Sequence, residues 1–317
     1  MTDRNKSGLN ITGRVISAHG RHYAVRPLEQ ELGPLLHCVT RGKNTDVACG
    51  DIVEVSPSGD NTARIEKVAE RRSLLYRSDA MRQKLLASNV TQLLIVTATE
   101  PGFNTELISR ALVAAHQQDV QARILLNKCD LTTRLAQARE QLAPFSALGI
   151  PVLEMSALSS INVANQATPT IDTVAQLRPL LEGEVTLLVG QSGMGKSTLI
   201  NALIPGAAVA TQEISAALDS GRHTTTHATW HTINANSALI DSPGFQLFGL
   251  AHIALDELDV AFPELQPYLG ECRFRDCRHQ QEPGCAVREA AEAGQIHPHR
   301  WTAYQDIRAE IEALPKY

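Results

Sequence analysis

The sequence has no apolar run long enough to span a bilayer, which requires about 20 residues. Residues 1–7 carry charges with no apolar segment behind them, so we expect no secretory signal. Basic residues are not in excess: 29 Lys and Arg stand against 34 Asp and Glu, and the net charge of −5 gives no compositional support for nucleic-acid binding. These absences predict a cytoplasmic protein that does not bind membranes.

Cysteine is sparse, with six in the chain, and three of these lie in its last quarter. A disulfide framework is not expected in a reducing compartment. With one histidine these three form a compact set, which is Cys272, Cys277, His279 and Cys285. Three sulfurs and one imidazole are a common structural zinc site, because four ligands close a tetrahedron. Buried free thiols are the alternative, but the stretch is too polar for a core. His297 and His299 are less compact substitutes for His279. We predict one structural Zn²⁺ per chain.

Short strands separated by turn residues run from residue 10 to about residue 70, for example at 12–17, 22–25 and 51–55. Their alternation is nearer period two than the helical period of 3.6. Several short strands with glycine punctuation predict a small β-barrel, for which an OB-fold is our choice. An SH3-like barrel would give nearly the same pattern.

Strands and helices alternate from about residue 85, which predicts a mostly parallel sheet with helices on both faces. We expect strands at 92–98, 123–126, 151–155 and 185–189, and helices at 107–115, 134–145 and 196–203. Beyond residue 248 the strands stop, and a helical pattern surrounds the Cys/His cluster and ends in a helix at 301–314. The chain is therefore expected to have three domains, an OB-fold barrel at 1–78, an α/β domain at 79–249 and a zinc-binding helical domain at 250–317.

A glycine-rich loop follows the expected strand at 185–189 and opens a helix. It fits G-x-x-x-x-G-K-[ST] at every position, and with the next residue it comprises Gly190, Gln191, Ser192, Gly193, Met194, Gly195, Lys196, Ser197 and Thr198. Glycines let backbone amides curl around phosphate oxygens, Lys196 places a cation on the β- and γ-phosphates, and Ser197 offers a hydroxyl to Mg²⁺. A coincidental glycine turn is the alternative, but the flanking strand and helix argue for a phosphate loop.

A second motif indicates which base is bound, since it fits N-K-x-D with the residues Asn127, Lys128, Cys129 and Asp130. The Asp130 carboxylate can accept hydrogen bonds from guanine N1–H and the 2-amino group. Adenine would leave this charged acceptor unpaired, at a cost above roughly 1–3 kcal/mol. Ser156 and Ala157 follow the next strand and suit the weaker motif whose backbone amide contacts guanine O6. We therefore predict GTP and GDP as ligands.

Residues that sense the γ-phosphate are expected after the phosphate loop. The D-x-x-G sequence from Asp241 to Gly244 ends an apolar run, so Asp241 would hold Mg²⁺ through water and the Gly244 amide would sense the γ-phosphate. Between these motifs lies the stretch 221–226, in which Thr224 or Thr225 could ligate Mg²⁺. We take Thr225 as the magnesium ligand together with Ser197.

The residue after Gly244 is Phe245, where Ras-like enzymes place the glutamine that orients the attacking water. Intrinsic hydrolysis should therefore be slow unless another group positions the water. His223 is the candidate for this catalytic role, and an exposed loop histidine is the equally supported alternative.

The motif order is circularly permuted. Conventional GTPases begin with the phosphate loop, whereas here the guanine motif at 127–130 and the Ser-Ala motif at 156–157 precede the loop at 190–197. As a result the chain runs directly from the D-x-x-G motif into the C-terminal segment. Nucleotide state could then move that segment.

This combination resembles the RsgA (YjeQ) family of GTPases that act in biogenesis of the small ribosomal subunit. The resemblance covers nearly the whole chain, and its carriers are 127–130, 190–197, 221–226, 241–244 and the Cys272/Cys277/His279/Cys285 spacing. It implies docking on the small subunit and its rRNA through the OB-fold and zinc domain, late-stage maturation, and hydrolysis stimulated by that subunit. His223 matches the family's proposed catalytic histidine. We expect a monomer.

Three other functions compete with this one. A P-loop kinase or ATPase would need neither N-K-x-D nor permuted motifs. A pure RNA-binding module would leave the phosphate loop unexplained, although an OB-fold with a zinc knuckle could suffice for RNA binding. A permuted GTPase acting elsewhere, for example on the large subunit, would not be expected to carry both flanking domains.

Overall fold

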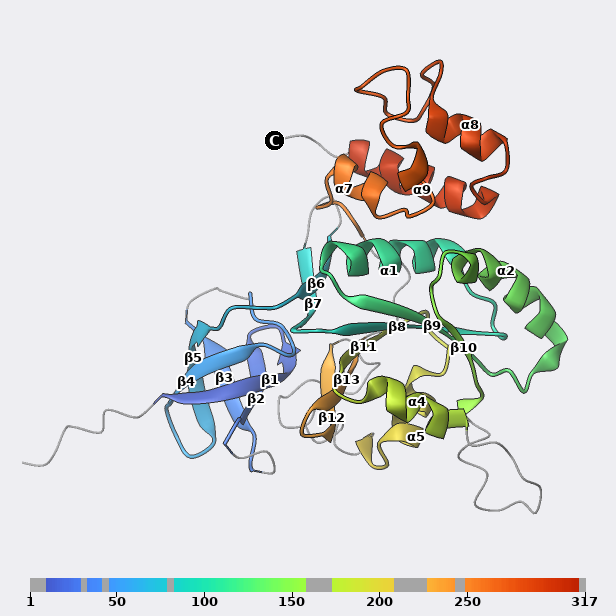
Figure 1. Cartoon of the computed structure of the whole chain (residues 1–317). Coiled ribbons are helices and arrows are strands. Elements are labelled where there is room, and N and C mark those ends of the chain that lie inside the picture. The colour runs from blue at the N-terminus through green and yellow to red at the C-terminus, as the bar shows by residue number, and fades with distance from the viewer. Residues whose placement is uncertain are drawn as a thin grey trace, which may run out of the picture.

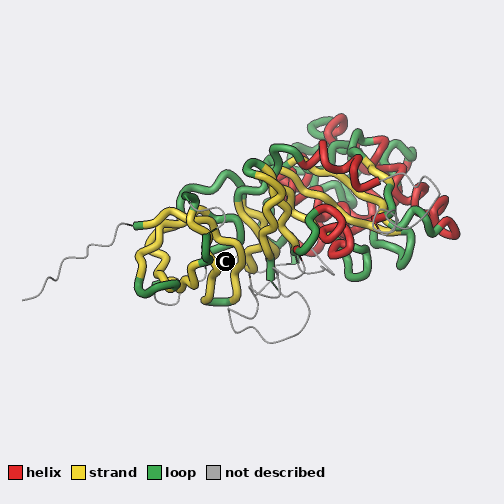
Figure 2. The backbone as a smooth tube through the Cα atoms, turned by 90° about the horizontal axis from the view of Figure 1, so that it is seen from below, coloured by secondary structure: helices red, strands yellow, loops and turns green. Residues whose placement is uncertain are grey.

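A computed structural model of the chain describes residues 10–29, 33–41, 46–78, 83–157, 173–207, 227–242 and 249–313. A β-barrel lies at one side of a central sheet, and the C-terminal helices lie on the outer side of helix α1 (Figure 1). Seen from below, the strands of the barrel and the sheet follow one another along the molecule (Figure 2). None of the described helices is long and apolar enough to cross a membrane.

The N-terminal barrel is closed by five strands. These are β1 (Ile11–His19), β2 (His22–Pro27), β3 (Leu36–Thr40), β4 (Ile52–Pro57) and β5 (Thr62–Val68). They are ordered β1-β2-β3-β5-β4, and β4 returns to pair with β1. The β3–β5 pair is parallel and the other pairs are antiparallel. Alternate residues such as Val15, Val25, Val53 and Val55 fill its interior. The predicted OB-fold barrel is confirmed.

A two-stranded hairpin links the barrel to the next domain. It consists of β6 (Leu74–Ser78) and β7 (Gln83–Ser88), and an isolated bridge joins Cys49 to Ala87. The sequence patterns did not predict this hairpin.

The central sheet contains the predicted parallel strands. Its strands are β8 (Gln92–Ala98), β9 (Gln121–Asn127), β10 (Val152–Glu154), β11 (Val185–Val189), β12 (Thr229–Asn234) and β13 (Ser237–Asp241). They are ordered β10-β9-β8-β11-β13-β12, and only β12 runs antiparallel to its neighbour β13. All seven residues of β8 are buried, as expected for a strand covered on both faces.

The barrel also touches the edge of this sheet. Ser17 of β1 pairs with Thr229 of β12, and the Ser17 hydroxyl donates to the Ala228 carbonyl at 3.2 Å. This antiparallel contact joins the barrel and the sheet into one run of eleven strands.

Helices cover both faces of the sheet. Helices α1 (Thr105–Gln117) and α2 (Leu135–Ala147) lie on one face, while α4 (Thr173–Leu181) and α5 (Lys196–Leu203) lie on the other (Figure 1). A short 3-10 helix, η1 (Thr132–Arg134), precedes α2. Leu107, Ile108, Ala111 and Ala115 of α1 are buried against the core, and Leu112 is half-buried. The central domain therefore has the predicted three-layer α/β architecture.

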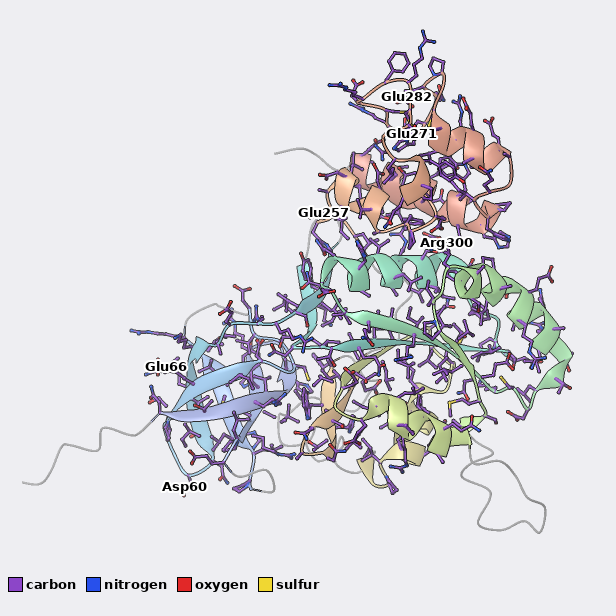
Figure 3. All side chains as sticks on the ribbon, viewed as in Figure 1. Asp60, Glu66, Glu257, Glu271, Glu282 and Arg300 are labelled. Carbon is purple, nitrogen blue, oxygen red and sulfur yellow. The ribbon has the colours of Figure 1, made fainter. Side chains whose placement is uncertain are left out.

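The C-terminal segment is helical and packs on α1. It contains α7 (Leu255–Val260), η3 (Gln266–Tyr268), α8 (Ala286–Glu292) and α9 (Pro298–Glu312). Helix α9 starts three residues earlier than predicted, because the His297 side chain accepts from the His299 amide and Pro298 suits the first turn. Across the interface Arg110 of α1 pairs with Glu310 at 2.6 Å. Arg300 of α9, which is labelled in Figure 3, donates to the Ser109 hydroxyl at 2.7 Å.

Candidate functional site

The phosphate loop leaves the buried strand β11 and enters α5. Gly190, Gly193 and Gly195 have φ values of 151°, 83° and 93°, which strongly favour glycine. A Cβ atom on Gly190 would lie 2.3 Å from the Val96 carbonyl oxygen, and one on Gly195 would lie 2.4 Å from Asn127 Nδ2. The glycines thus allow the loop to press against β8 and β9 and to turn into α5. Met194 is buried, and the exposed Ser197 and half-buried Thr198 lie in the first turn of that helix.

Lys196 begins helix α5, and Asp241 ends the strand β13 that neighbours β11. Leu188 of β11 is in register with Asp241, the last residue of β13. The Lys196 ammonium donates to the Gly190 and Gln191 carbonyls at 2.7 and 3.1 Å. Asp241 Oδ1 is buried and has no hydrogen-bond partner among the described residues. Burial raises the pKa of Asp241 to about 6, and the charge of Lys196 opposes that shift. A buried carboxylate oxygen without a partner fits a site that receives a cation such as Mg²⁺.

Asn127 connects the three nucleotide motifs. It ends β9, its Nδ2 donates to the Met194 carbonyl at 2.9 Å, and its Oδ1 accepts from the Ala157 amide at 3.0 Å. This side chain therefore holds the phosphate loop against the Ser-Ala motif. Asn127 is 2% exposed, and both polar atoms of its side chain make these contacts.

The remaining residues of the guanine motif lie at the rim. Asp130 is exposed, and its carboxylate accepts a hydrogen bond from the Ser156 hydroxyl. Lys128 has a left-handed φ of 60°, and its ammonium donates to the Glu100 carbonyl at 2.7 Å. The half-buried Cys129 donates its amide to the Met155 carbonyl at 3.0 Å, which ties the two motifs together. The fold therefore brings both predicted guanine motifs beside the phosphate loop.

Four predicted site residues, His223, Thr224, Thr225 and Gly244, lie outside the described residues, as does Phe245. Their roles stay predictions.

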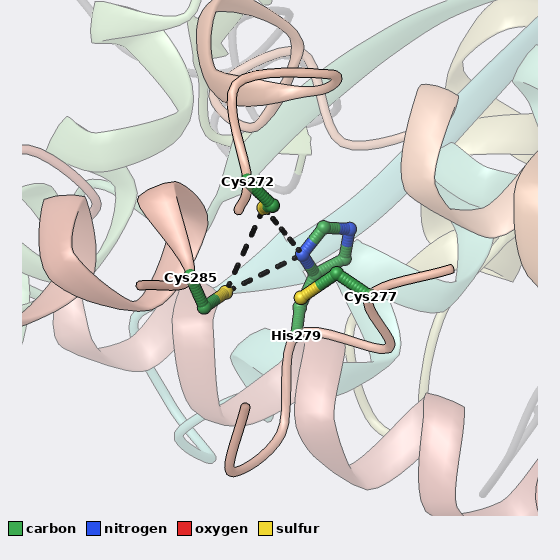
Figure 4. A group of neighbouring side chains, drawn as sticks. All are labelled: Cys272, Cys277, His279 and Cys285. Atoms are coloured by element: carbon green, nitrogen blue, oxygen red, sulfur yellow. Dashed lines mark hydrogen bonds between the residues drawn. The ribbon is translucent and has the colours of Figure 1, made fainter. Parts of the chain in front are cut away.

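The Cys/His cluster is assembled as its spacing predicts. The ligand atoms of Cys272, Cys277, His279 and Cys285 all lie within 4.8 Å of one another (Figure 4). The Cys272 and Cys285 sulfurs are 3.9 Å apart, and each lies 3.5 Å from His279 Nδ1. A tetrahedral ion with Zn–S bonds of about 2.3 Å separates its sulfurs by about 3.8 Å. All four cysteine and histidine side chains therefore fit one metal ion.

Asp259 lies beside the His279 nitrogen that does not face the sulfurs. Its Oδ2 lies 3.8 Å from His279 Nε2, and its Oδ1 accepts from the Tyr304 hydroxyl at 2.6 Å and from Arg308 at 2.9 Å. A carboxylate that accepts a hydrogen bond from a ligating histidine orients the ring towards the metal, and Asp259 is the carboxylate placed to do so. Asp259 lies on α7, far from the cluster in sequence, so no spacing motif points to it.

Comparison with known proteins identifies the family. The model of the RsgA GTPase family matches residues 68–251, more than half of the chain. A relative from Burkholderia pseudomallei strain 668, named small ribosomal subunit biogenesis GTPase RsgA, is 49% identical over 98% of this chain and 95% of its own length. The chain belongs to the RsgA GTPase family.

Other members of the family agree with this assignment. A relative of the same name from Paraburkholderia phymatum is 47% identical over 99% of this chain and 96% of its own. Among solved structures, YjeQ from Thermotoga maritima has a TM-score of 0.69 at 29% identity and covers 96% of this chain and 99% of its own. YloQ, described as a circularly permuted GTPase, has a TM-score of 0.64 at 25% identity over the full length of both chains.

Family membership establishes the enzyme class. The chain is a circularly permuted GTPase that hydrolyses GTP, and its ligands are GTP, GDP and Mg²⁺. The alternatives of a P-loop kinase or ATPase and of a pure RNA-binding module are therefore wrong.

One contact of the RsgA-type site was missed by the sequence motifs. Gln191 of the phosphate loop accepts from the backbone amide of Asn104 at 3.0 Å through its Oε1. Asn104 caps α1 by accepting from the Glu106 amide. The phosphate loop is thus joined to the N-terminus of α1, a link between distant residues that the loop motif does not encode.

Proposed function

We propose that this GTPase binds the small ribosomal subunit and assists its late maturation, and that the subunit stimulates its hydrolysis of GTP to GDP and phosphate. The observation that carries the proposal is the extent of the similarity. Relatives named for biogenesis of the small subunit match over 98–99% of this chain, so the barrel, the GTPase domain and the Cys/His segment are all shared.

The nucleotide lies at the carboxyl ends of β8, β9 and β11 in this proposal. The residues assigned to GTP are 127–130, 156–157, 190–198, Asp241, Gly244 and the threonines at 224 and 225. Asp130 reads the guanine edge and the Lys128 stem covers the base plane. Lys196, which donates to loop carbonyls, would turn to the β- and γ-phosphates when these compete for its ammonium.

The catalytic step depends on residues near the γ-phosphate. Ser197 and Thr225 would hold Mg²⁺, and Asp241 would support it through water, consistent with its unpartnered buried oxygen. His223 would position the attacking water, because Phe245 cannot. Mg²⁺ supplies neutralisation of the developing phosphate charge when bound.

The Cys/His cluster holds one structural Zn²⁺ in this proposal. The 3.9 Å sulfur separation and the Asp259 carboxylate behind His279 support a closed four-ligand site. The zinc fixes the loop between η3 and α8, which has few apolar residues of its own.

The proposal extends to the partner, the oligomeric state and the cellular location. The barrel and the zinc domain would contact the rRNA of the small subunit. The protein would act as a cytoplasmic monomer, with domains at 1–78, 79–249 and 250–317. The first of these boundaries lies between the two strands of the β6–β7 hairpin.

The test is GTP hydrolysis by the purified protein, alone and with small or large ribosomal subunits. We expect strong stimulation by the small subunit only. A His223→Ala variant should lose this stimulation, whereas the control His116→Ala, which removes an exposed histidine of α1, should keep it. No stimulation of the wild-type protein would overturn the ribosomal proposal. Normal stimulation of His223→Ala would overturn only the role of that histidine.

A further inference from the structure

Two consecutive residues between β8 and α1, Thr99 and Glu100, lie against the guanine motif. Thr99 directly follows β8, and it belongs to none of the nucleotide motifs found in the sequence. Its side chain is buried, with Thr99 only 2% exposed. A buried hydroxyl costs free energy unless it is hydrogen-bonded. The partner of the Thr99 hydroxyl therefore indicates what this side chain holds in place.

Three hydrogen bonds join these two residues to the start of the guanine motif. The Thr99 hydroxyl donates to the Lys128 carbonyl at 2.8 Å, and the Thr99 amide donates to the Asn127 carbonyl at 3.2 Å. The Lys128 ammonium in turn donates to the Glu100 carbonyl at 2.7 Å. Lys128 is therefore held both at its backbone and at its side chain.

Lys128 needs this support because its backbone has a rare conformation. Its φ of 60° lies in the left-handed region, which is unfavourable for a residue with a Cβ atom. Such a conformation persists where the surrounding structure holds it, and it is concentrated at ligand sites. The Lys128 carbonyl also accepts from the Leu131 amide at 2.9 Å, and this bond closes the turn that carries Asp130. The Thr99 hydroxyl thus binds the carbonyl on which the Asp130 turn depends.

The contacts that hold the phosphate loop do not involve the Thr99 hydroxyl. The Lys196 ammonium donates to the Gly190 and Gln191 carbonyls, and Asn127 Nδ2 donates to the Met194 carbonyl. Loss of the hydroxyl should therefore disturb the part of the site that meets the base and leave the phosphate loop intact.

We infer that Thr99 is a positioning residue for the guanine base. Its hydroxyl fixes the Lys128 carbonyl and, through it, the turn 128–131, so that the Lys128 stem and the Asp130 carboxylate meet the base. Thr99 acts through these residues and not by touching the nucleotide. The inference rests on the proposed guanine-binding role of residues 127–130.

The test compares GDP with inorganic pyrophosphate, which fills the phosphate loop but has no base. Both affinities are measured by calorimetry on the full-length protein with Mg²⁺. Thr99→Val keeps the shape of the side chain and removes the hydroxyl. We expect this variant to lose about three- to tenfold in GDP affinity, the effect of one hydrogen bond, and to bind pyrophosphate like the wild-type protein. Thr99→Ser keeps the hydroxyl and should keep the GDP affinity.

Thr97→Val is the matched control. Thr97 is also buried, and its hydroxyl donates to the Leu125 carbonyl of β9 at 3.0 Å. This variant removes the same kind of hydrogen bond between the same two chain segments, but at a carbonyl outside the guanine motif. Both valine variants should lose similar stability in denaturant unfolding, whereas only Thr99→Val should lose GDP affinity.

Two results would overturn the role of Thr99. One is equal GDP affinity in the Thr99→Val and Thr97→Val proteins, and the other is an equal loss of GDP and pyrophosphate affinity in Thr99→Val. Asp130→Ala tests the proposed guanine site separately. If this variant keeps its GDP affinity, the proposed role of residues 127–130 fails and the inference fails with it. If it loses GDP affinity while Thr99→Val does not, only the role of Thr99 fails.

Discussion

Replacing Arg300 by Met should destabilise the C-terminal helices, including their contact with α1. Arg300 is 2% exposed, donates at 2.6 Å to Glu264 and at 2.7 Å to the Ser109 hydroxyl, and lies 4.3 Å from the Phe262 ring centre. Methionine keeps the apolar stem but leaves the Glu264 carboxylate, which is only 7% exposed, without its cation. Breaking a buried ion pair in this way costs about 3–5 kcal/mol. The lost cation–π contact contributes about 2 kcal/mol at most, so the unpaired carboxylate dominates.

Denaturant unfolding followed by Trp301 fluorescence measures this effect, because Trp301 adjoins Arg300 on α9. A Trp230→Phe background removes the other fluorophore. The double variant Arg300→Met/Glu264→Gln removes the stranded charge as well, and it should recover at least about 1 kcal/mol relative to the single variant. A single variant that loses less than about 1 kcal/mol would refute the reasoning, and so would a double variant that is no more stable.

Three further substitutions test other contacts. Gly195→Ala should lower the affinity for GDP at least tenfold, as measured by calorimetry. The added Cβ would lie 2.4 Å from Asn127 Nδ2, and the backbone φ of 93° is strained for alanine. An unchanged affinity would show that the loop can shift to accept the Cβ. Asp259→Asn should weaken zinc binding about 10–100-fold in a chelator competition, and equal zinc retention would exclude a supporting role. Burial lowers the pKa of His231 to about 4, so its neutral form stabilises the fold at neutral pH and this contribution is lost as pH falls from about 6.5 towards 4. The free energy of unfolding should therefore fall less between pH 6.5 and pH 4 in His231→Gln than in the wild-type protein. The same pH dependence in both proteins would contradict this.

The fold was predictable where the pattern is local. The buried run of β8 and the strand–loop–helix around Gly190 identified the α/β domain, because hydrophobic periodicity reports burial directly. The choice between an OB-fold and an SH3-like barrel was not local. It depends on which strands close the barrel, and the β3–β5 and β1–β4 pairs join residues that no short pattern connects. The β6–β7 hairpin joins strands that are neighbours in the chain, and it was missed nonetheless.

The site likewise contains residues that could be predicted from the sequence and residues that could not. Phosphate, guanine and zinc chemistry each impose a fixed spacing, so the residues from Gly190 to Ser197 and the Cys/His cluster could be found in the sequence. The residues that hold these motifs in place could not. Asp259 of α7 lies beside His279, and Gln191 contacts the start of α1, and both contacts exist only once the chain is folded.

The pairing of Ser17 with Thr229 determines which strand edge a protein without the barrel would expose. Strand β12 is the last strand of the GTPase sheet, and the barrel covers part of its open edge. An uncovered edge strand presents backbone groups that another molecule can pair with. A shortened protein that begins after the barrel would expose this edge and should self-associate. We therefore expect the GTPase sheet to need the barrel at this edge in order to stay monomeric.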